Sequence, residues 1–230
     1  MSKEIIRATE IDEAEGIHVQ RLMPAPRSQN YGPFVRWDQF SVGPSASSVR
    51  RSESGCETLV YLWSGALRHE DDLGRGTVIA GGARCLTAGR GVEQSETPQG
   101  GVPVRGIRLS IDLPRRLKKS APACQQVYAD QLPVRKITGG RITTIVGDGS
   151  PLASNGLLRC QELRLDPGAT WQENLPDGYR GLVYSVSGSA AVGGSSIDDG
   201  EACLFDDPGK YRIEAREECR LMCCLARTVL

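Results

Sequence analysis

The sequence is poor in histidine, the commonest side-chain ligand for metals, with two residues among 230, His18 and His69. Neither has a second histidine at ligand spacing, so a site built from several imidazoles is excluded by count. An excess of positive charge is also absent, because 28 Lys and Arg residues balance 28 Asp and Glu residues. Without a basic surface that could follow a phosphate backbone, we expect no direct contact with nucleic acid.

Long apolar runs are missing as well. No segment approaches the roughly 20 apolar residues of a membrane span, and the first sixteen residues, MSKEIIRATEIDEAEG, contain no apolar signal segment. We therefore expect a soluble cytoplasmic protein that does not contact membranes. The eight cysteines include no CxxC pair, and in a reducing compartment they are expected to be free thiols.

What the sequence does contain is a succession of short β-rich runs. Turn residues (Gly, Pro, Asp and Ser) separate them every eight to twelve positions, a pattern typical of sandwiches and barrels. Helical periodicity is limited to one short helix expected around residues 121–132. The sequence therefore predicts an all-β protein. Examples of the runs are TLVYLW (58–63), GTVIAG (76–81), GLVYSVSG (181–188) and CRLMCCLA (219–226).

Two segments far apart in the sequence resemble each other. Residues 58–67 read TLVYLWSGAL and residues 181–190 read GLVYSVSGSA, so both place LVY-x-x-SG ahead of a new strand. Matching aromatic and glycine positions in the same order favour a duplicated barrel over a coincidence of hairpins. A connector rich in proline and charge, residues 113–133, separates the two halves.

Four segments together resemble the pirin family. The sequence is similar to pirins at RLMPAPRSQNYGPFVRWDQF (21–40), GCETLVYLWSGALRHEDDLG (55–74), LTAGRGVEQSETP (86–98) and RLSIDLP (108–114). The resemblance implies a bicupin, which is an all-β fold of two stacked antiparallel β-barrels of the cupin or jelly-roll type. We expect an N-terminal barrel at residues 1–115, a connector at 116–145 and a C-terminal barrel at 146–230.

The resemblance also implies one iron site in the N-terminal barrel, with quercetin dioxygenase activity or transcriptional co-regulation in several members. The family places a histidine pair just before R-G-x-E-T, and this sequence has Arg51 and Glu53 there. It places a histidine and a glutamate after T-A-G-R-G, and this sequence has Gln94 and Glu96. Glu57 matches the glutamate of the wider cupin motif. Glu96 alone keeps the family's ligand type.

The substitutions change what the site can bind. A guanidinium group has no lone pair to donate and carries a permanent positive charge, so Arg51 repels a cation. Alternate residues of a strand face the same side, so Arg51, Glu53 and Glu57 are expected on one face, and Gln94 and Glu96 on the matching face of a second strand. If the family's strand register holds, these five side chains converge at the barrel mouth.

Three interpretations of this group stay open. Arg51 pairs with Glu53 or Glu96 and the cluster is an internal brace in place of the metal. Alternatively, Arg51 anchors an anion, and crowding of Glu53, Glu57 and Glu96 raises one carboxyl pKa for general acid/base catalysis. In the third, Glu53, Gln94 and Glu96 hold a hard divalent ion, which Arg51 disfavours.

We favour binding or conversion of a small anionic molecule, aromatic or enolic, in the N-terminal barrel without iron or another cofactor. The catalytic candidates are Glu53, Glu57 and Glu96, and the binding candidates are Arg51 and Gln94. The alternatives are a quercetin 2,3-dioxygenase-like oxygenase that keeps iron or another divalent metal through atypical ligands, and a non-enzymatic regulatory protein that contacts a protein partner.

Overall fold

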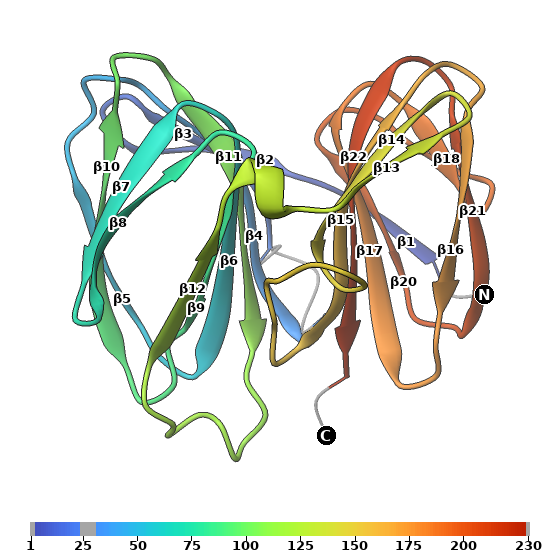
Figure 1. The fold of residues 1–230 in the computed structure, drawn as a ribbon. Helices are drawn as coiled ribbons and strands as arrows, with labels where there is room; N and C mark the ends of the chain where they lie inside the picture. The colour runs from blue at the N-terminus through green and yellow to red at the C-terminus, as the bar shows by residue number, and fades with distance from the viewer. Residues whose placement is uncertain (1–2, 24–30, 229–230) are drawn as a thin grey trace. The chain divides into compact units, whose positions relative to one another are not determined.

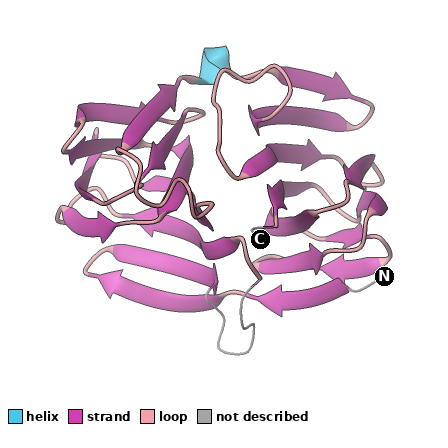
Figure 2. Ribbon diagram, turned by 90° about the horizontal axis from the view of Figure 1, so that it is seen from below, coloured by secondary structure: helices cyan, strands magenta, loops and turns pink. Residues whose placement is uncertain are grey.

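The computed structural model describes residues 3–23 and 31–228. Residues 24–30 of the pirin-like motif at 21–40 lie outside the described residues. Within the described ranges the chain forms twenty-two β-strands and one short 3-10 helix, η1 (Ala129–Gln131), which is drawn in cyan in Figure 2. The predicted all-β class is confirmed. No helix in this part of the chain is long and apolar enough to cross a membrane.

The chain folds into two compact units, whose strands are labelled in Figure 1. The N-terminal unit comprises residues 9–132 and 151–156. Its seven-stranded sheet has the order β12-β9-β6-β11-β4-β3-β2, and its four-stranded sheet has the order β5-β10-β7-β8. The strands are β2 (Thr9–Ala14), β3 (Ile17–Met23), β4 (Phe34–Val42), β5 (Val49–Glu53), β6 (Cys56–Ser64), β7 (Ala66–Asp71), β8 (Gly74–Ile79), β9 (Ala83–Thr87), β10 (Val92–Gln99), β11 (Val104–Asp112) and β12 (Ala123–Val127).

The C-terminal unit comprises residues 3–8, 133–150 and 157–228. It also has a seven-stranded sheet, β1-β20-β17-β22-β15-β14-β13, and a four-stranded sheet, β16-β21-β18-β19. The strands are β1 (Lys3–Arg7), β13 (Val134–Ile137), β14 (Gly140–Val146), β15 (Leu157–Leu165), β16 (Thr170–Leu175), β17 (Tyr179–Ser187), β18 (Ala190–Val192), β19 (Ser195–Ile197), β20 (Glu201–Phe205), β21 (Gly209–Ala215) and β22 (Cys219–Arg227).

The two units repeat one topology. Each position in the strand order of one unit has a counterpart in the other, with β6 matching β17, β10 matching β21 and β5 matching β16. The two LVY segments lie in β6 and β17, as the internal repeat predicts. A glycine follows each of these strands with the same positive φ of 76°, Gly65 in one unit and Gly188 in the other.

The observed unit boundaries differ from the expected ones at both ends of the first half. Strand β1 pairs with β20 of the C-terminal unit. The expected connector at 116–145 instead contributes β12 to the N-terminal unit and β13 to the C-terminal unit. In the matched strand orders, β1 and β12 take equivalent edge positions. The helix expected at 121–132 is replaced by strand β12 and η1, because these residues pair with the edge of β9.

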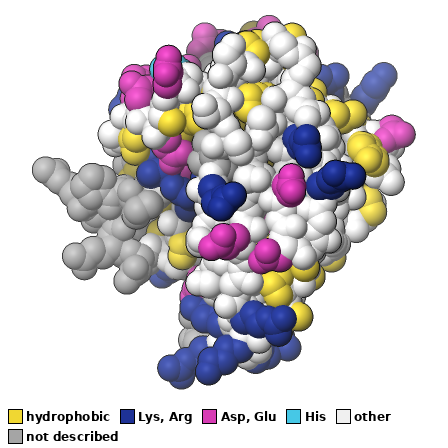
Figure 3. Space-filling model, turned by 90° about the vertical axis from the view of Figure 1, so that its left-hand side faces the viewer, with side chains coloured by type: hydrophobic (Ala, Val, Ile, Leu, Met, Phe, Trp, Pro, Cys, Tyr) yellow, Lys and Arg dark blue, Asp and Glu magenta, His cyan; other side chains and the backbone are white. Residues whose placement is uncertain are grey.

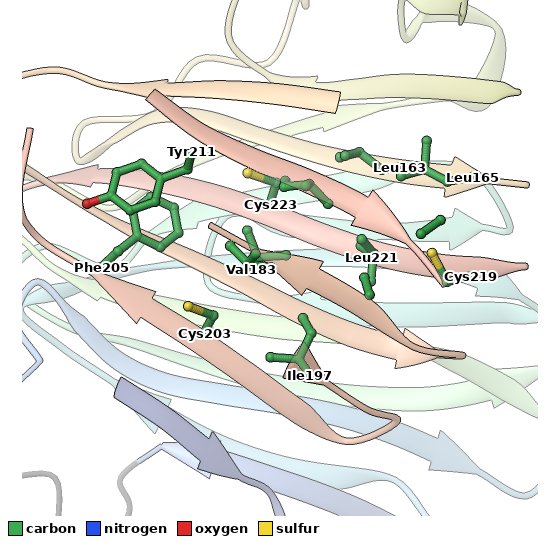
Figure 4. Packing of buried hydrophobic residues seen from close by; sticks show 14 of the residues in the cluster. Leu163, Leu165, Val183, Ile197, Cys203, Phe205, Tyr211, Cys219, Leu221 and Cys223 are labelled. Carbon is green, nitrogen blue, oxygen red and sulfur yellow. The ribbon is translucent and has the colours of Figure 1, made fainter. Parts of the chain in front are cut away.

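The interiors of the two units differ in chemistry. The C-terminal unit is filled mainly by apolar side chains, including Phe205 and Tyr211, whose ring centres lie 4.2 Å apart (Figure 4). The N-terminal unit has an apolar cluster that includes Phe40 and Leu62, but it also buries many charged groups. Five of them are less than 6% exposed: Asp38, Glu57, Arg84, Glu96 and Arg108. On the face shown in Figure 3, acidic and basic side chains are interspersed over the middle, and basic side chains gather at the lower end.

Candidate anion site in the N-terminal barrel

Strands β5 and β10 bring four of the five expected site residues together. Arg51 lies directly opposite Gln94 in the antiparallel pair, and Glu53 lies opposite Val92. Glu96, two residues beyond Gln94, shares the inward face, and both are at most 5% exposed. Arg51 and Glu53 share one face of β5, and Gln94 and Glu96 share one face of β10, because alternate strand residues face the same side. The pairing of β5 with β10 brings these two faces together in the interior of the barrel.

Each of these four side chains bonds to protein groups. Arg51 donates from Nη1 to Glu96 Oε2 at 3.0 Å. Gln94 donates from Nε2 to Glu53 Oε1 at 2.8 Å, and the Thr58 hydroxyl donates to Glu53 Oε2 at 2.6 Å. The four side chains therefore form two hydrogen-bonded pairs, in which each carboxylate accepts from a donor side chain.

Glu57 does not join this group, contrary to the expectation from strand alternation. Gly55, at a φ of 66°, turns the chain between β5 and β6, so the alternation does not continue across it. Glu57 lies on the outer face of β6 and accepts bonds from the backbone N of Asn155 (3.0 Å) and from the Thr87 hydroxyl (2.9 Å). It also accepts a bond from the Ser154 hydroxyl. Glu57 therefore anchors residues 151–156 to its own unit, and the expected crowding of three carboxylates is not found.

Two buried arginines that the sequence analysis did not single out complete the site. Arg108 of β11 donates from Nη2 to Glu96 Oε2, the oxygen that also accepts from Arg51. Arg84 of β9 donates from Nη1 to Gln94 Oε1 at 2.7 Å and from Nη2 to Asp71 Oδ2. Inward-facing positions of β9 and β11 could be guessed from alternation, but their partners depend on strand pairings between distant segments.

A carboxylate from the edge strand β2 also reaches the site. Glu13 Oε2 accepts from Arg51 Nη2 at 2.8 Å, and Glu13 Oε1 accepts from Arg21 Nη2 at 2.5 Å. Burial opposes ionisation of Glu13, but the hydrogen bond from Arg21 and the charge of Arg51 outweigh it and lower its pKa. Arg21 and Arg36 in turn contact Asp38, which is fully buried.

The buried histidine beside this network favours its neutral form. His69 lies opposite Glu96 in the β7–β10 pair. Its Nε2 is 3.1 Å from Gln126 Oε1, and its Nδ1 is 3.7 Å from Asp71 Oδ2. Burial, followed by the charge of Arg84, lowers the pKa of His69. The neutral ring packs against the salt-bridge network and adds no net charge to it.

A small cavity lies between the apolar and the charged parts of the interior. Its volume is about 20 Å³, which is room for about one water molecule. Arg108 lines this cavity and is 3% exposed. Its Nε has no hydrogen-bond partner among the described residues. The other lining residues are Glu13, Ile17, Val19, Phe40, Val42, Ser47, Arg51, Leu67 and Glu96.

The residues present do not fit a metal ion. In the described part of the chain, no group of three or more His, Cys, Asp or Glu side chains is arranged to hold one. The oxygen of Gln94 already accepts from Arg84, and one oxygen of Glu96 accepts from two arginines. These guanidinium groups would face any cation held by Gln94 or Glu96, and two positive charges at such distances repel strongly in a buried site.

The matching positions of the C-terminal barrel carry different side chains. The turn glycines align the two barrels: His69 lies four residues after Gly65, and Val192 lies four residues after Gly188. The strand partners of these two residues then match, so Glu96 corresponds to Ile213. In the same register, the counterparts of Gln94, Arg51 and Glu53 are Tyr211, Glu173 and Leu175. Glu173 is paired with Arg159, and the other three counterparts belong to the core cluster. The duplication therefore left one polar interior and one apolar interior.

Known proteins resemble this chain in sequence. A family model for pirin matches residues 16–110, the part that contains Arg51, Glu53, Gln94 and Glu96. A pirin-like protein of Solanum lycopersicum is 31% identical over 86% of this chain and 71% of its own length. A putative quercetin 2,3-dioxygenase of Pseudomonas aeruginosa is 31% identical over 79% of this chain and 70% of its own length.

Solved structures confirm the bicupin fold. The crystal structure of GK1651 from Geobacillus kaustophilus superposes with a TM-score of 0.88 at 25% identity, over 98% of this chain and 95% of that one. A bacterial pirin of Escherichia coli, YhhW, in complex with nickel(II), superposes with a TM-score of 0.81 at 12% identity over the full length of both chains. The sequence relatives and the fold together show that this chain belongs to the pirin family.

Proposed function

We propose that the N-terminal barrel binds a small organic anion through buried guanidinium groups, without a metal ion. The observation that carries the proposal is a buried guanidinium group beside the cavity that has a donor left over. Arg51 and Arg108 line the cavity together with two carboxylates, Glu13 and Glu96, to which they are ion-paired. The Nε of Arg108 has no hydrogen-bond partner among the described residues, and a buried polar group without a partner is costly, so a bound anion would stabilise the site.

Arg108 and Arg51 are the anchoring groups in this proposal. The Nε of Arg108 is a buried donor without a partner among the described residues beside the cavity, and leaving such a donor unpaired costs about 1–3 kcal/mol. Burial, followed by the charge of Arg108, lowers the pKa of Arg51. An anion between the two guanidinium groups would pair the free donor and reduce the repulsion between them.

Glu53 is the carboxylate best suited to exchange a proton with a bound molecule. Glu96 accepts from two arginines and acts as their counter-ion, and Glu57 lies on the other face of its strand. Glu53 is held by Gln94 and Thr58 and lines an open groove of about 280 Å³ that is separate from the cavity lined by Arg51 and Arg108. It shares the inward face of β5 with Arg51, about 7 Å away along the strand. We therefore assign the acid/base role to Glu53.

Calorimetric titration of chelator-treated protein with pyruvate, benzoate and 4-nitrophenolate tests the binding. We expect at least one of these anions to bind, and Arg51→Met and Arg108→Met to weaken that binding at least tenfold. The matched control is Arg68→Met, which removes an exposed arginine that pairs with Glu70. If no anion binds, or if Arg68→Met weakens binding as much, the proposal fails.

Hydrogen exchange tests the acid/base role separately. A carboxylate that removes a proton from the methyl group of pyruvate gives an enolate, and return of a deuteron from D₂O labels the methyl carbon without any oxidant. We expect label to accumulate with the wild-type protein and to fall at least a hundredfold with Glu53→Gln. Exchange that persists in Glu53→Gln would remove Glu53 from this role while leaving the binding proposal intact.

A further inference from the structure

The carboxylate of Glu13 is held in the way an anionic ligand would be held. Its two oxygens contact three guanidinium groups, at 2.5 Å from Arg21 Nη2, 2.8 Å from Arg51 Nη2 and 3.4 Å from Arg36 Nη2. The Glu13 side chain is 17% exposed and lines the cavity of the N-terminal unit. A planar carboxylate among several guanidinium forks is the arrangement that recognises carboxylates in general.

Strand alternation turns Glu13 inward. Along β2, Ile11 and Glu13 are partly buried, whereas Asp12 and Ala14 are exposed. In the β2–β3 pair, Asp12 lies opposite His18 and Ala14 lies opposite Ile17, so Glu13 is also the extra residue of a bulge. Asp12 points to solvent with its side chain 79% exposed. One acidic residue of this strand therefore lies over the arginines.

Glu13 also spans the edges of the two sheets. Strand β2 is the edge of the seven-stranded sheet, and β5, which carries Arg51, is the edge of the four-stranded sheet. Within the described strands, β2 pairs with β3 alone. The Glu13–Arg51 ion pair therefore connects two edges that belong to different hydrogen-bonded ladders. Moving β2 away from Arg51 would break side-chain contacts but no backbone ladder between the sheets.

We propose that Glu13 occupies the subsite for the carboxylate of a small monocarboxylate ligand, and that the ligand displaces it. The inference rests on the anion-binding function proposed above and names the class of anion. The ligand's carboxylate would take the contacts that Glu13 now makes with Arg51 and Arg21. Its short apolar part would pack against Ile17, Val19 and Phe40, which line the same cavity.

The charges elsewhere on the unit favour this route of entry. An open groove of about 350 Å³ is lined by Glu70, Asp71, Asp72 and Glu93, with Arg50 as its one basic residue. Such a lining repels an anion. Removing the Glu13 carboxylate, in contrast, would leave Arg51 and Arg108 with Glu96 as the one carboxylate in the cavity lining. The three guanidinium groups that contact Glu13 would then face a vacated space.

The proposal is tested by removing the Glu13 side chain and measuring whether a free carboxylate, propionate, binds in its place. The variant is Glu13→Ala, and the control is Asp12→Ala, which removes a carboxylate from the adjacent exposed position. Each full-length protein is titrated with sodium propionate in a calorimeter and melted in propionate, with sodium chloride and sodium nitrate at the same ionic strength as references. If Glu13→Ala fails to fold, Glu13→Gln takes its place.

We expect propionate to bind Glu13→Ala at least tenfold more tightly than it binds the wild type, and to raise the melting temperature of that variant more than chloride or nitrate does. Asp12→Ala should match the wild type. Adding Arg51→Met to Glu13→Ala should abolish the gain. Equal affinity of the wild type and Glu13→Ala, with binding still dependent on Arg51, would overturn the displacement of Glu13 by the ligand and leave the anion site standing. Absence of Arg51-dependent binding in every variant would overturn both. A gain with nitrate equal to that with propionate would overturn the assignment to carboxylates.

Discussion

Glu96 shows how one residue changes its role when its neighbours change. It keeps the residue type of a family metal-ligand position, yet one of its oxygens accepts from both Arg51 and Arg108. A carboxylate between two guanidinium groups neutralises them and holds them at a fixed spacing. Glu96 is therefore the counter-ion on which the buried positive charges depend.

Removal of this counter-ion should be costly. We predict that Glu96→Gln lowers the free energy of unfolding by about 3 kcal/mol or more, because it leaves buried guanidinium charge without compensation. The matched control is Glu70→Gln, which breaks an exposed pair with Arg68 and should cost less than about 1 kcal/mol. Urea denaturation measures both. Similar losses for the two variants would show that Glu96 does not neutralise a buried cluster.

Glu13 should give stability a specific dependence on acid. Its pKa in the folded protein is lowered from an ordinary value of 4.5, so the unfolded chain takes up the proton first as the pH falls. The stabilisation is therefore complete above about pH 5.5 and is lost as the pH drops below 4.5 towards the folded pKa. We predict that the stability difference between the wild type and Glu13→Gln shrinks over that range in urea melts. A difference that stays constant or grows on acidification would contradict the ion pairing of Glu13.

At the scale of elements, the hairpin turns fix the frame that carries the site. Gly65 and Gly188 end the equivalent strands β6 and β17 with the same φ of 76°. A Cβ at Gly65 would lie 2.8 Å from the carbonyl oxygen of Pro103, and one at Gly188 would lie 2.4 Å from that of Glu218. The two units therefore use the same close backbone approach at the same point of the repeat.

Substitution of these glycines tests whether the turns are equivalent. Gly168 is the control, because its φ of 79° is similar and a Cβ there meets nothing within 4 Å. We predict that Gly168→Ala costs about 1–2 kcal/mol for the left-handed conformation. Gly65→Ala and Gly188→Ala should each cost at least about 1 kcal/mol more for the steric overlap. Equal losses at all three positions, measured by urea denaturation, would show that close packing is not what these turns require.

Elements also explain which parts of the site the sequence could predict. Alternation correctly placed Arg51 and Glu53 on one face of β5, and Gln94 and Glu96 on one face of β10, because alternation within a strand is a local property. That the two faces meet was expected only from the strand register implied by the resemblance to pirins, and β5 and β10 do pair in that way. Glu57 was misplaced because the Gly55 turn separates its strand from β5 and resets the alternation. Glu13 was missed because its contact with Arg51 depends on where the edge strand β2 lies relative to β5, which alternation within one strand does not specify.

Long-range pairing explains the remaining omissions. Arg84 and Arg108 reach the site because β9 and β11 both pair with β6, and Asp71 does so because β7 pairs with β10. Such registers depend on hydrogen bonds between segments distant in the chain, which composition and periodicity do not specify. The all-β class and the repeat needed only local turn chemistry and alternation, and both were predicted.

At the scale of the whole molecule, one barrel keeps a polar interior while its repeat has an apolar one. The cavity of the polar barrel measures about 20 Å³, whereas pockets for drug-sized ligands usually measure roughly 300–1,000 Å³. In our proposal the displacement of Glu13 makes room for a small anion, whereas a flavonol would require a much larger rearrangement. The volume and the guanidinium groups together favour a small ligand over the flavonol named for the relative from Pseudomonas aeruginosa.

We accordingly predict that the protein does not cleave quercetin at a measurable rate. Flavonol oxygenolysis needs a group that activates dioxygen, and the residues at the family ligand positions do not fit the metal that would supply it. Oxygen consumption with quercetin, in buffer and with added Fe²⁺ or Ni²⁺, is the measurement. Oxygen uptake that is lost in Glu53→Gln or Glu96→Gln would show that a working metal site is present.

The central claim is that guanidinium groups bind an anion at the positions that the resemblance to pirins matches to metal ligands. It is tested most directly by measuring propionate affinity on one preparation in three states. The three states are the protein as purified, the protein after exhaustive chelation, and the protein with a stoichiometric amount of Fe²⁺ or Ni²⁺ added. The wild type and Glu13→Ala are both measured in each state. Elemental analysis of the same samples gives their metal content. The account predicts far less than one equivalent of metal in the first state and the same propionate affinity in all three, for each protein. Stoichiometric metal in the purified protein, together with propionate binding that disappears on chelation and returns with the ion, would contradict it.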